Sequence, residues 1–173
     1  MKNYQSFSSE ETRKFGESLA KKILTPLSSR LSPRALTLAL QGDLGAGKTT
    51  FTQGFFKGLG IRRRAVSPTF VIMRHYKIPG RRSDKRPAVA KAMAGKHVTN
   101  NTDFTDIYHF DAYRLKKVED LAVLEFDRIL SDPRNIILIE WPERIKEVLP
   151  KNAIWLRFQH SRKENERKII IKE

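Results

Sequence analysis

Gly42-Asp43-Leu44-Gly45-Ala46-Gly47-Lys48-Thr49 is the most informative stretch of this 173-residue chain. It has the spacing of a phosphate-binding loop, in which two glycines enclose four residues and Lys-Thr follows the second glycine. The apolar run Ala35–Leu40 predicts a buried strand just before the loop, and Lys48–Leu59 predicts a helix that ends at Gly60. A plain glycine-rich turn is the alternative, but it does not require Lys-Thr after its last glycine. We therefore predict a phosphate-binding loop.

The chemistry of this loop follows from its residue types. Glycines allow the backbone to fold tightly and to direct successive N–H groups toward an anion. The start of the following helix adds the positive end of the helix dipole. We expect Lys48 to reach the β- and γ-phosphates of ATP or a close relative and to act in catalysis. The Thr49 hydroxyl is expected to ligate Mg²⁺, which prefers oxygen ligands.

Two carboxylates follow predicted strands elsewhere in the chain. Glu140 ends the apolar run Ile136–Ile139, and in P-loop enzymes an acid at that place holds the Mg²⁺ shell. Asp111 follows the run Ile107–Phe110, and the strand ends of open α/β sheets meet at the ligand crevice. An acid there is suited to orient the attacking water or a metal-bound water, with Arg114 pairing with a phosphate or with Asp111. For both acids the alternative is a carboxylate at the surface.

The segment Val66-Ser67-Pro68-Thr69-Phe70 follows the predicted phosphate-loop helix. A nucleotide-sensing switch segment is expected at this place in the chain, with Thr69 close to the γ-phosphate or to Mg²⁺. The alternative is a turn that Pro68 fixes before the next strand.

The remaining apolar pattern predicts an α/β fold of the P-loop NTPase class. A first helix is expected to be capped by Ser8 and Glu11 and to end before Pro26, and a second, Val118–Leu130, to turn Leu121, Leu124 and Ile129 inward. A helical turn is expected to begin at Pro142. The remaining strands are expected at Phe70–Tyr76, Ala153–Phe158 and Lys168–Ile171. We expect one domain, residues 1–173, whose central sheet has a parallel core, antiparallel edge strands and flanking helices.

The segment from Lys77 to Asp103 differs in composition from the rest of the chain. It is rich in Gly, Pro, Asn, Ser and cations, holds Asp84 as its single internal acid, and has little apolar periodicity. We predict a basic, flexible insertion in a loop at about residues 77–103.

The overall composition limits the class of protein. Hydrophobic residues make up 39% and charged residues 31%, no cysteine is present, and no apolar run approaches the roughly 18 residues that span a bilayer. Disulfides and cysteine-ligated metals are excluded, and we expect a cytoplasmic protein with no membrane partner. The net charge of +15 favours a polyanionic partner such as RNA, or reflects a basic proteome. The histidines have no metal-ligand spacing, and we expect His109 to be packed or hydrogen-bonded rather than catalytic.

Together these motifs resemble the TsaE (YjeE) family, the ATPases of bacterial tRNA threonylcarbamoyladenosine biosynthesis. The matching segments are Gly42 to Phe51, Ser67-Pro68-Thr69-Phe70, His109-Phe110-Asp111-Ala112-Tyr113-Arg114-Leu115 and Ile139-Glu140-Trp141-Pro142-Glu143. Their order and approximate spacing are similar over nearly the whole chain. A bare P-loop is unspecific, whereas its combination with Asp-x-Tyr-Arg and Ile-Glu-Trp-Pro is specific.

The resemblance implies roles for individual residues. Nucleotide contacts are implied for Ser9, Leu44, Gly45, Ala46, Gly47, Lys48, Thr49, Thr50, Thr69, Asp111, Ala112, Tyr113, Arg114 and Trp141. The implied Mg²⁺ ligands are Thr49 and Glu140, and Asp111 is needed for turnover. Ala112 departs from the family pattern, because a larger apolar residue is usual there. The long basic insertion and the strong positive charge are also departures.

The resemblance further implies a role in a complex. Family members hydrolyse ATP weakly alone and act with the TsaB and TsaD proteins, which place threonylcarbamoyl on adenosine 37 of tRNAs that read codons beginning with A. This chain would drive or reset that complex, and it would meet tRNA indirectly through it.

Three other functions share parts of the pattern. A small-molecule P-loop kinase would need an arginine-bearing lid, and the basic insertion lacks a clear helical frame for one. A GTPase is disfavoured because no Asn-Lys-x-Asp segment is present. An RNA-binding module with vestigial nucleotide binding is the third, and the intact Lys48, Thr49 and Glu140 argue against it.

Overall fold

The computed structural model describes residues 2–25, 34–62, 72–79, 104–115, 117, 119–161 and 165–172. Its strands are β1 (Lys2–Ser6), β2 (Leu36–Gln41), β3 (Met73–Lys77), β4 (Asp106–Asp111), β5 (Asn135–Glu140), β6 (Ile154–His160) and β7 (Arg167–Lys172). Its helices are α1 (Ser9–Leu24), α2 (Lys48–Gly58), α4 (Asp120–Val123) and α5 (Phe126–Ser131), with 3₁₀ segments η1 (Ala112–Arg114) and η2 (Pro142–Val148). No helix in this described part is long and apolar enough to cross a membrane.

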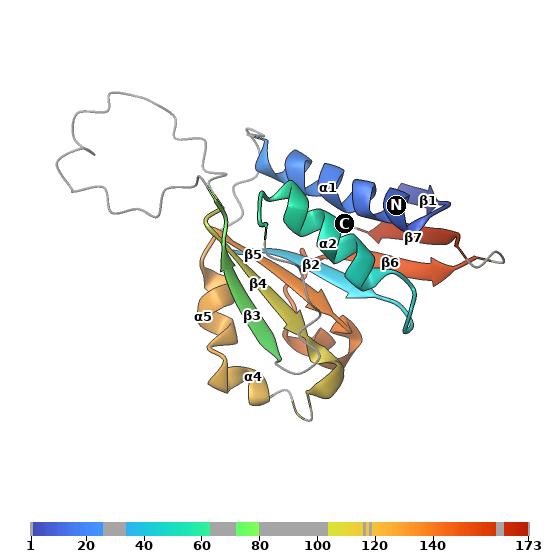
Figure 1. Cartoon of the computed structure of the whole chain (residues 1–173). Helices are drawn as coiled ribbons and strands as arrows, with labels where there is room; N and C mark the ends of the chain where they lie inside the picture. The colour runs from blue at the N-terminus through green and yellow to red at the C-terminus, as the bar shows by residue number, and fades with distance from the viewer. Residues whose placement is uncertain are drawn as a thin grey trace, which may run out of the picture.

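The strands form a seven-stranded sheet in the order β1-β7-β6-β2-β5-β4-β3 (Figure 1). The inner strands β6, β2, β5 and β4 pair in parallel. At one edge β3 pairs antiparallel with β4, and at the other β7 and β1 continue the sheet antiparallel. The predicted α/β fold, with a parallel core and antiparallel edges, is confirmed.

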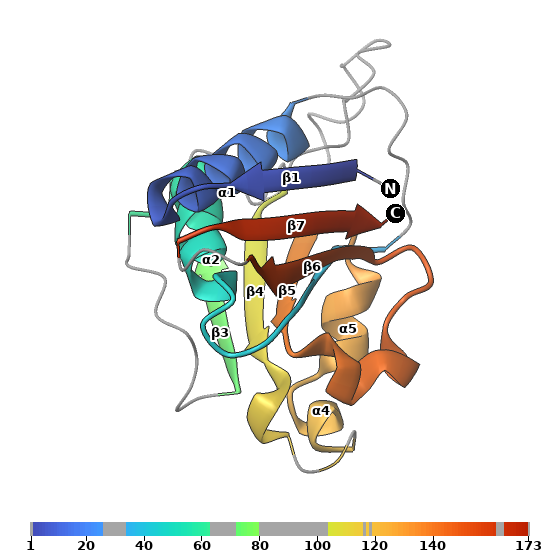
Figure 2. The same cartoon turned by 90° about the vertical axis from the view of Figure 1, so that its right-hand side faces the viewer.

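Helices cover the sheet unequally. α1 and α2 lie over one face, whereas α4 and α5 lie on the other face beside β4 and β5 (Figures 1 and 2). The buried strand β5 contributes to the hydrophobic cores on both faces of the sheet. Ile136 and Leu138 belong to the core between the sheet and α1 and α2, here called the α2-side core. Ile137 and Ile139 belong to the core between the sheet and α5, here called the α5-side core. This alternation explains why the strand reads as a continuous apolar run.

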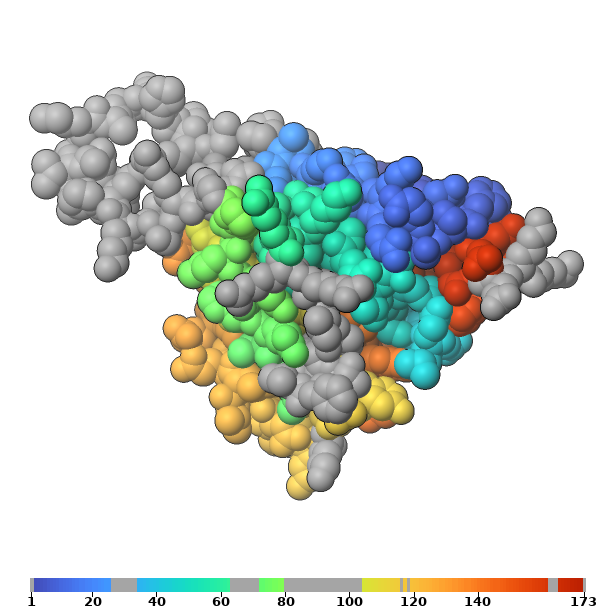
Figure 3. All heavy atoms as spheres, in the orientation of Figure 1, coloured from blue at the N-terminus to red at the C-terminus, as the bar shows by residue number. Residues whose placement is uncertain are grey.

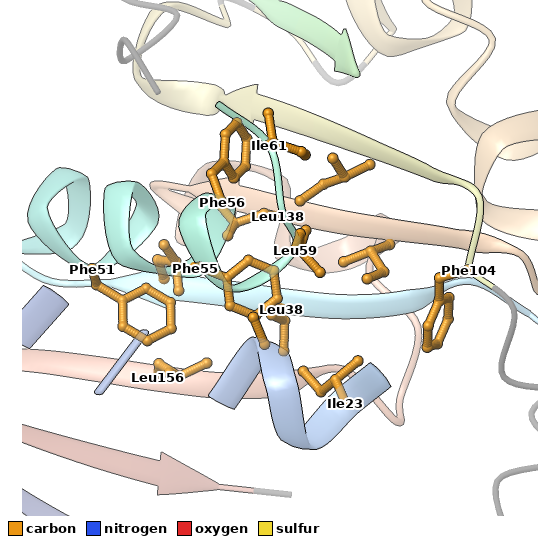
Figure 4. Packing of buried hydrophobic residues seen from close by; sticks show 14 of the residues in the cluster. Ile23, Leu38, Phe51, Phe55, Phe56, Leu59, Ile61, Phe104, Leu138 and Leu156 are labelled. Carbon is orange, nitrogen blue, oxygen red and sulfur yellow. The ribbon is translucent and has the colours of Figure 1, made fainter. Parts of the chain in front are cut away.

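The α2-side core positions the helix that begins at the phosphate loop. Phe51, Phe55 and Phe56 of α2 are completely or almost completely buried and pack toward Leu38 of β2 and Leu138 of β5 (Figure 4). The first residues of α2 are therefore held above the carboxyl ends of β2 and β5.

The N-terminal cap of α1 agrees with its sequence signal. The Ser8 side chain accepts a hydrogen bond from the Glu11 N–H at 3.1 Å. The Glu11 carboxylate in turn accepts from the N–H of Phe7 at 2.8 Å, one residue before the cap. The predicted start of this helix is confirmed, and the helix ends at Leu24, before Pro26.

The single helix predicted over 118–130 is wrong. Two short helices, α4 and α5, are separated by Leu124 and Glu125, and the φ of Glu125, 53°, lies in the left-handed region. In a continuous helix Phe126 would lie about 140° around the axis from Leu121, at about 100° per residue. The break allows both side chains to be buried, with Ile129 also buried as expected.

Two edges of the sheet differ from the sequence prediction. β1 was not expected, because Tyr4 is its only large apolar residue, yet it pairs with β7 over its whole length. At the start of the expected insertion, Lys77 is the last residue of β3 and Ile78 is buried. The rest of that insertion, from residue 80 to 103, lies outside the described residues.

α1 and α2 approach each other very closely. A Cβ atom on Gly54 of α2 would overlap the carbonyl oxygen of Arg13 on α1. Gly16 of α1 meets the backbone of Phe51 in the same way, and a Cβ on Gly58 would lie 2.5 Å from the carbonyl oxygen of Glu17. The contact therefore requires hydrogen in place of a side chain at all three glycines.

Gly54→Ala is expected to lower the free energy of unfolding by roughly 1–3 kcal/mol, the usual cost of overpacking. This loss outweighs the gain of about 1 kcal/mol in helix propensity. Urea denaturation measures it, with Ser18→Ala on the exposed side of α1 as the control expected to change little. A Gly54→Ala protein as stable as the parent would contradict the close helix crossing.

Candidate nucleotide-binding site

The loop between β2 and α2 has the backbone geometry that its glycines permit. Gly42, Gly45 and Gly47 have φ values of 148°, 74° and 101°, a range that disfavours other residues. A Cβ on Gly42 would lie 2.5 Å from the carbonyl oxygen of Phe158 on β6. Ala46 is buried, whereas Leu44 at the tip is 86% exposed. The loop is thus seated on β6 and open to solvent at its tip.

Side chains from distant parts of the chain hold the loop carbonyl groups. His160 Nε2, at the end of β6, lies 3.4 Å from the carbonyl oxygen of Leu44 as a donor. The guanidinium of Arg167, at the start of β7, donates to the carbonyl oxygen of Gly45 at 3.3 Å. Sequence reasoning missed both residues, because they are more than a hundred positions from the loop and belong to no motif.

Lys48 occupies the centre of the site. Its Nζ donates to the carbonyl oxygens of Gly42 at 2.5 Å and Asp43 at 2.9 Å, and it lies 4.1 Å from the ring centroid of Trp141. Burial lowers the pKa of Lys48, and the nearby carboxylates, first that of Glu140, oppose the shift. The ammonium therefore depends on close polar partners, and a phosphate would be a stronger one.

The two predicted acids end neighbouring parallel strands. Asp111 closes β4 and Glu140 closes β5, and the two residues are directly opposite each other in the ladder. Glu140 shares the face of Leu138, which α2 covers, and only 3% of Glu140 is exposed. The Asp111 carboxylate accepts from the N–H of Tyr113 at 3.0 Å. The structure brings both acids to the carboxyl ends of the parallel strands, beneath the start of α2.

His109 is a hydrogen-bonded buried residue, as expected. Its Nε2 lies 3.0 Å from Oε1 of Glu140, and both side chains are almost completely buried. Its Nδ1 has no hydrogen-bond partner among the described residues. The imidazole packs edge-on to the ring of Phe56 on α2. His109 therefore fixes one oxygen of Glu140 from inside the core, a role that its sequence position alone does not reveal.

An aromatic pair borders the site. Trp141 has φ of 59°, a left-handed conformation that is strained for a non-glycine residue. Its ring lies 5.1 Å from that of Tyr113, which is half exposed and has the Arg144 guanidinium 5.2 Å from its centroid. The strained turn comes directly after Glu140 and places the Trp141 ring against Lys48.

The other predicted site residues are placed less directly. Ala112 is fully buried in the α5-side core, so a ligand there would meet its backbone rather than its methyl group. Arg114 is exposed at the end of η1, and the η1 segment (yellow) lies close to the loop before α2 (cyan) on the surface in Figure 3. Thr49 and Thr50 lie in the first turn of α2 and are partly exposed. Thr69 lies outside the described residues.

The start of α1 lies beside the phosphate loop. A Cβ on Gly47 would be 3.8 Å from Cγ2 of Thr12, and the Thr12 hydroxyl is bonded to that of Ser6 at 2.8 Å. Ser9 is the exposed first residue of the same helix. The N-terminal segment for which the family resemblance implies a nucleotide contact is thus adjacent to the loop.

These features define a P-loop nucleotide-binding protein: a strand, a glycine loop with Lys-Thr, a helix, and acids at the ends of neighbouring parallel strands. A family model described as "Threonylcarbamoyl adenosine biosynthesis protein TsaE" matches residues 6–88 and 92–169. The chain belongs to the TsaE family.

Individual relatives agree with this assignment. The tRNA threonylcarbamoyladenosine biosynthesis protein TsaE of Bacillus subtilis is 34% identical over 134 residues, which are 77% of this chain and 67% of that protein. The protein of the same name from Haemophilus influenzae is 32% identical over 147 residues, 85% of this chain and 75% of that one. The crystal structure of Bacillus subtilis YdiB matches with a TM-score of 0.61 at 26% identity, covering 97% of this chain and 82% of that one.

His109→Leu is expected to lower the free energy of unfolding by roughly 1–3 kcal/mol, because it leaves the buried Glu140 carboxylate without this donor. His109→Gln keeps an N–H donor and should lose less. Urea denaturation of both variants at neutral pH makes the comparison. Equal losses would mean that His109 contributes packing alone.

Proposed function

We propose that this chain is an Mg²⁺-dependent ATPase that supports a TsaB–TsaD complex in forming N6-threonylcarbamoyladenosine at position 37 of tRNAs that read codons beginning with A. The observation that supports hydrolysis most directly is the position of Lys48 between the loop carbonyls and the acids Glu140 and Asp111. The names of the relatives support the pathway, and tRNA is reached through the complex.

The residues present fit Mg²⁺. The proposed ligands are the Thr49 hydroxyl and the Glu140 carboxylate, because Mg²⁺ is commonly held by few protein oxygens together with phosphates and waters. His109 holds Oε1 of Glu140 and so fixes the direction of the carboxylate. The ion supplies charge neutralisation for the β- and γ-phosphate oxygens when bound.

In the proposed hydrolysis, different protein groups bind the phosphates, stabilise the developing charge and orient the attacking water. The loop N–H groups and the start of α2 bind the phosphates. Lys48 exchanges its carbonyl partners for phosphate oxygens and stabilises the charge that develops on the γ-phosphoryl group. Asp111, fixed by the Tyr113 N–H, orients the attacking water. The Trp141 ring, whose centroid is 4.1 Å from Lys48 Nζ, limits the contact of the ammonium with water.

Lys48→Ala is expected to reduce ATP turnover at least about a hundredfold, the scale of losing one preorganised charge partner in a transition state. Steady-state phosphate release measures it, for the chain alone and with TsaB and TsaD added. Lys57→Ala on the same helix, which removes only a surface ion pair with Glu17, is the matched control. Near-normal turnover by Lys48→Ala would refute the ATPase proposal, and no response of the parent to TsaB and TsaD would refute the partnership.

Glu140→Ala and Asp111→Ala are expected to separate metal binding from hydrolysis. Glu140→Ala should weaken Mg²⁺-dependent nucleotide binding about tenfold or more, whereas Asp111→Ala should mainly slow turnover. A metal titration of nucleotide binding on both variants makes the comparison, with the exposed Asp127→Ala as the control. Equal losses of metal affinity in the two variants would show that the roles are divided differently.

A further inference from the structure

Among the described residues, no α-helix lies over the second face of β1, β7 and β6. α1 and α2 cover one face of β1, β7 and β6, whereas α4 and α5 lie beside β4 and β5 (Figure 2). Along β6 the core residues Leu156 and Phe158 alternate with Trp155 and Arg157, which point away from α1 and α2. β1, β7 and β6 therefore present their alternate residues on the side away from α1 and α2.

These alternate residues form a defined surface, here called the open face. It consists of Asn3, Gln5, Trp155, Arg157, Gln159, Lys168, Ile170 and Lys172. Strand pairing arranges them in rows: Trp155 lies opposite Lys172, and Gln159 lies opposite Lys168, which lies opposite Gln5. The open face is thus an ordered array of cations, amides and apolar groups.

The charge of the open face has one sign. Arg157, Lys168 and Lys172 are exposed, and none of them has an ion pair with another described residue. No acid belongs to the open face itself. At its margin lie Lys146 and Glu143 of η2, and Asp43 of the phosphate loop lines an adjoining hollow with Arg157. In a chain of net charge +15 this surface attracts polyanions.

A hollow beside Trp155 gives the open face a second kind of contact. It has a volume of about 380 Å³ and is lined by Gln41, Glu143, Lys146, Trp155, Arg157, Ile170 and Lys172. The Trp155 side chain is partly exposed and stacks on no aromatic ring in the described part of the chain. An aromatic ring in a hollow edged by cations is suited to stack a flat base while the cations hold its phosphates.

We propose that the open face binds single-stranded RNA directly. Lys168 and Lys172 are four residues apart on β7 and so about 13 Å apart along the strand, far enough to contact different phosphates. Trp155 stacks a base, and the amides Asn3, Gln5 and Gln159 hydrogen-bond base edges or ribose hydroxyls. An acidic protein surface could pair with the cations, but this pairing would not explain the hollow beside Trp155, whereas a stacked base would fill it. The inference goes beyond the proposed ATPase role, in which tRNA is met only through the complex.

The test uses the full chain without nucleotide and a fluorescein-labelled, unstructured 12-nucleotide RNA. Fluorescence anisotropy at about 50 and 200 mM salt gives the affinity and its salt slope. Lys168→Gln/Lys172→Gln removes two charges from the open face. Lys14→Gln/Lys22→Gln removes two exposed charges from α1 on the opposite face and is the matched control. All variants retain the cations of residues 80–103.

The open-face pair is expected to weaken RNA binding about tenfold and to reduce the salt slope by about 1.4, at about 0.7 for each phosphate that is no longer neutralised. The control pair should change affinity less than twofold. Trp155→Leu should weaken binding, and Trp155→Phe should restore most of it because the ring is retained. ATP turnover should be unchanged throughout, so RNA binding can fail or succeed independently of the ATPase proposal.

Three outcomes would overturn the proposal. Equal losses of affinity in the two charge pairs would mean diffuse attraction by net charge. Unchanged binding by Trp155→Leu would exclude stacking. Absence of RNA binding by the parent, together with loss of TsaB–TsaD association in the open-face pair, would make the surface a protein interface instead.

Discussion

A buried ammonium organises this protein. Lys48 Nζ is held by two loop carbonyl oxygens and the Trp141 ring, in surroundings that lower its pKa. A buried cation without such partners would cost several kcal/mol. The loop must therefore present its carbonyl groups inward to Lys48, and the acids must lie close enough to offset its burial. Because these partners are exchangeable, the same arrangement leaves Lys48 ready for a phosphate.

Strand register determines where the acids lie. Leu40, Glu140 and Asp111 are successive partners across β2, β5 and β4, so both acids lie at the level of Leu40, two residues before Gly42 of the phosphate loop. A slip of one residue would turn Glu140 to the opposite face, into the α5-side core. The slip would place the Glu140 carboxylate among apolar side chains without its His109 partner, and the cost of that burial opposes it. The register and the geometry of the site are thus linked through Glu140.

Strand β6 connects the phosphate site to the open face. Phe158 packs on Phe51 and supports Gly42 of the loop, while its neighbour Arg157 faces the solvent on the other side. His160, at the end of the same strand, contacts the loop tip. The core residues of β6 therefore pack on the helix-covered face, and the alternate residues Trp155, Arg157 and Gln159 lie on the open face. The alternation lets the two surfaces vary independently in sequence, although they share a backbone.

The sequence by itself determined the features whose physics is local. The loop at Gly42–Thr49, the cap at Ser8 and the acid at the end of Ile136–Glu140 each depend on neighbouring residues, so a contiguous stretch suffices to predict them. The nucleotide contacts predicted for single residues such as Ser9 and Thr69 stay predictions. Recognition of the family also rested on such contiguous stretches.

Tertiary structure decided what depends on contacts across the sheet. No local pattern relates the residues that meet in the pairing of β1 with β7, in the His109–Glu140 pair, or in the contacts of His160 and Arg167 with the loop. The break of the helix at Glu125 also depends on such contacts. The segment around Glu125 has helical periodicity, but burying both Leu121 and Phe126 against one sheet required the helix to break. Local propensity is weak compared with burial, so the packed core determined these features.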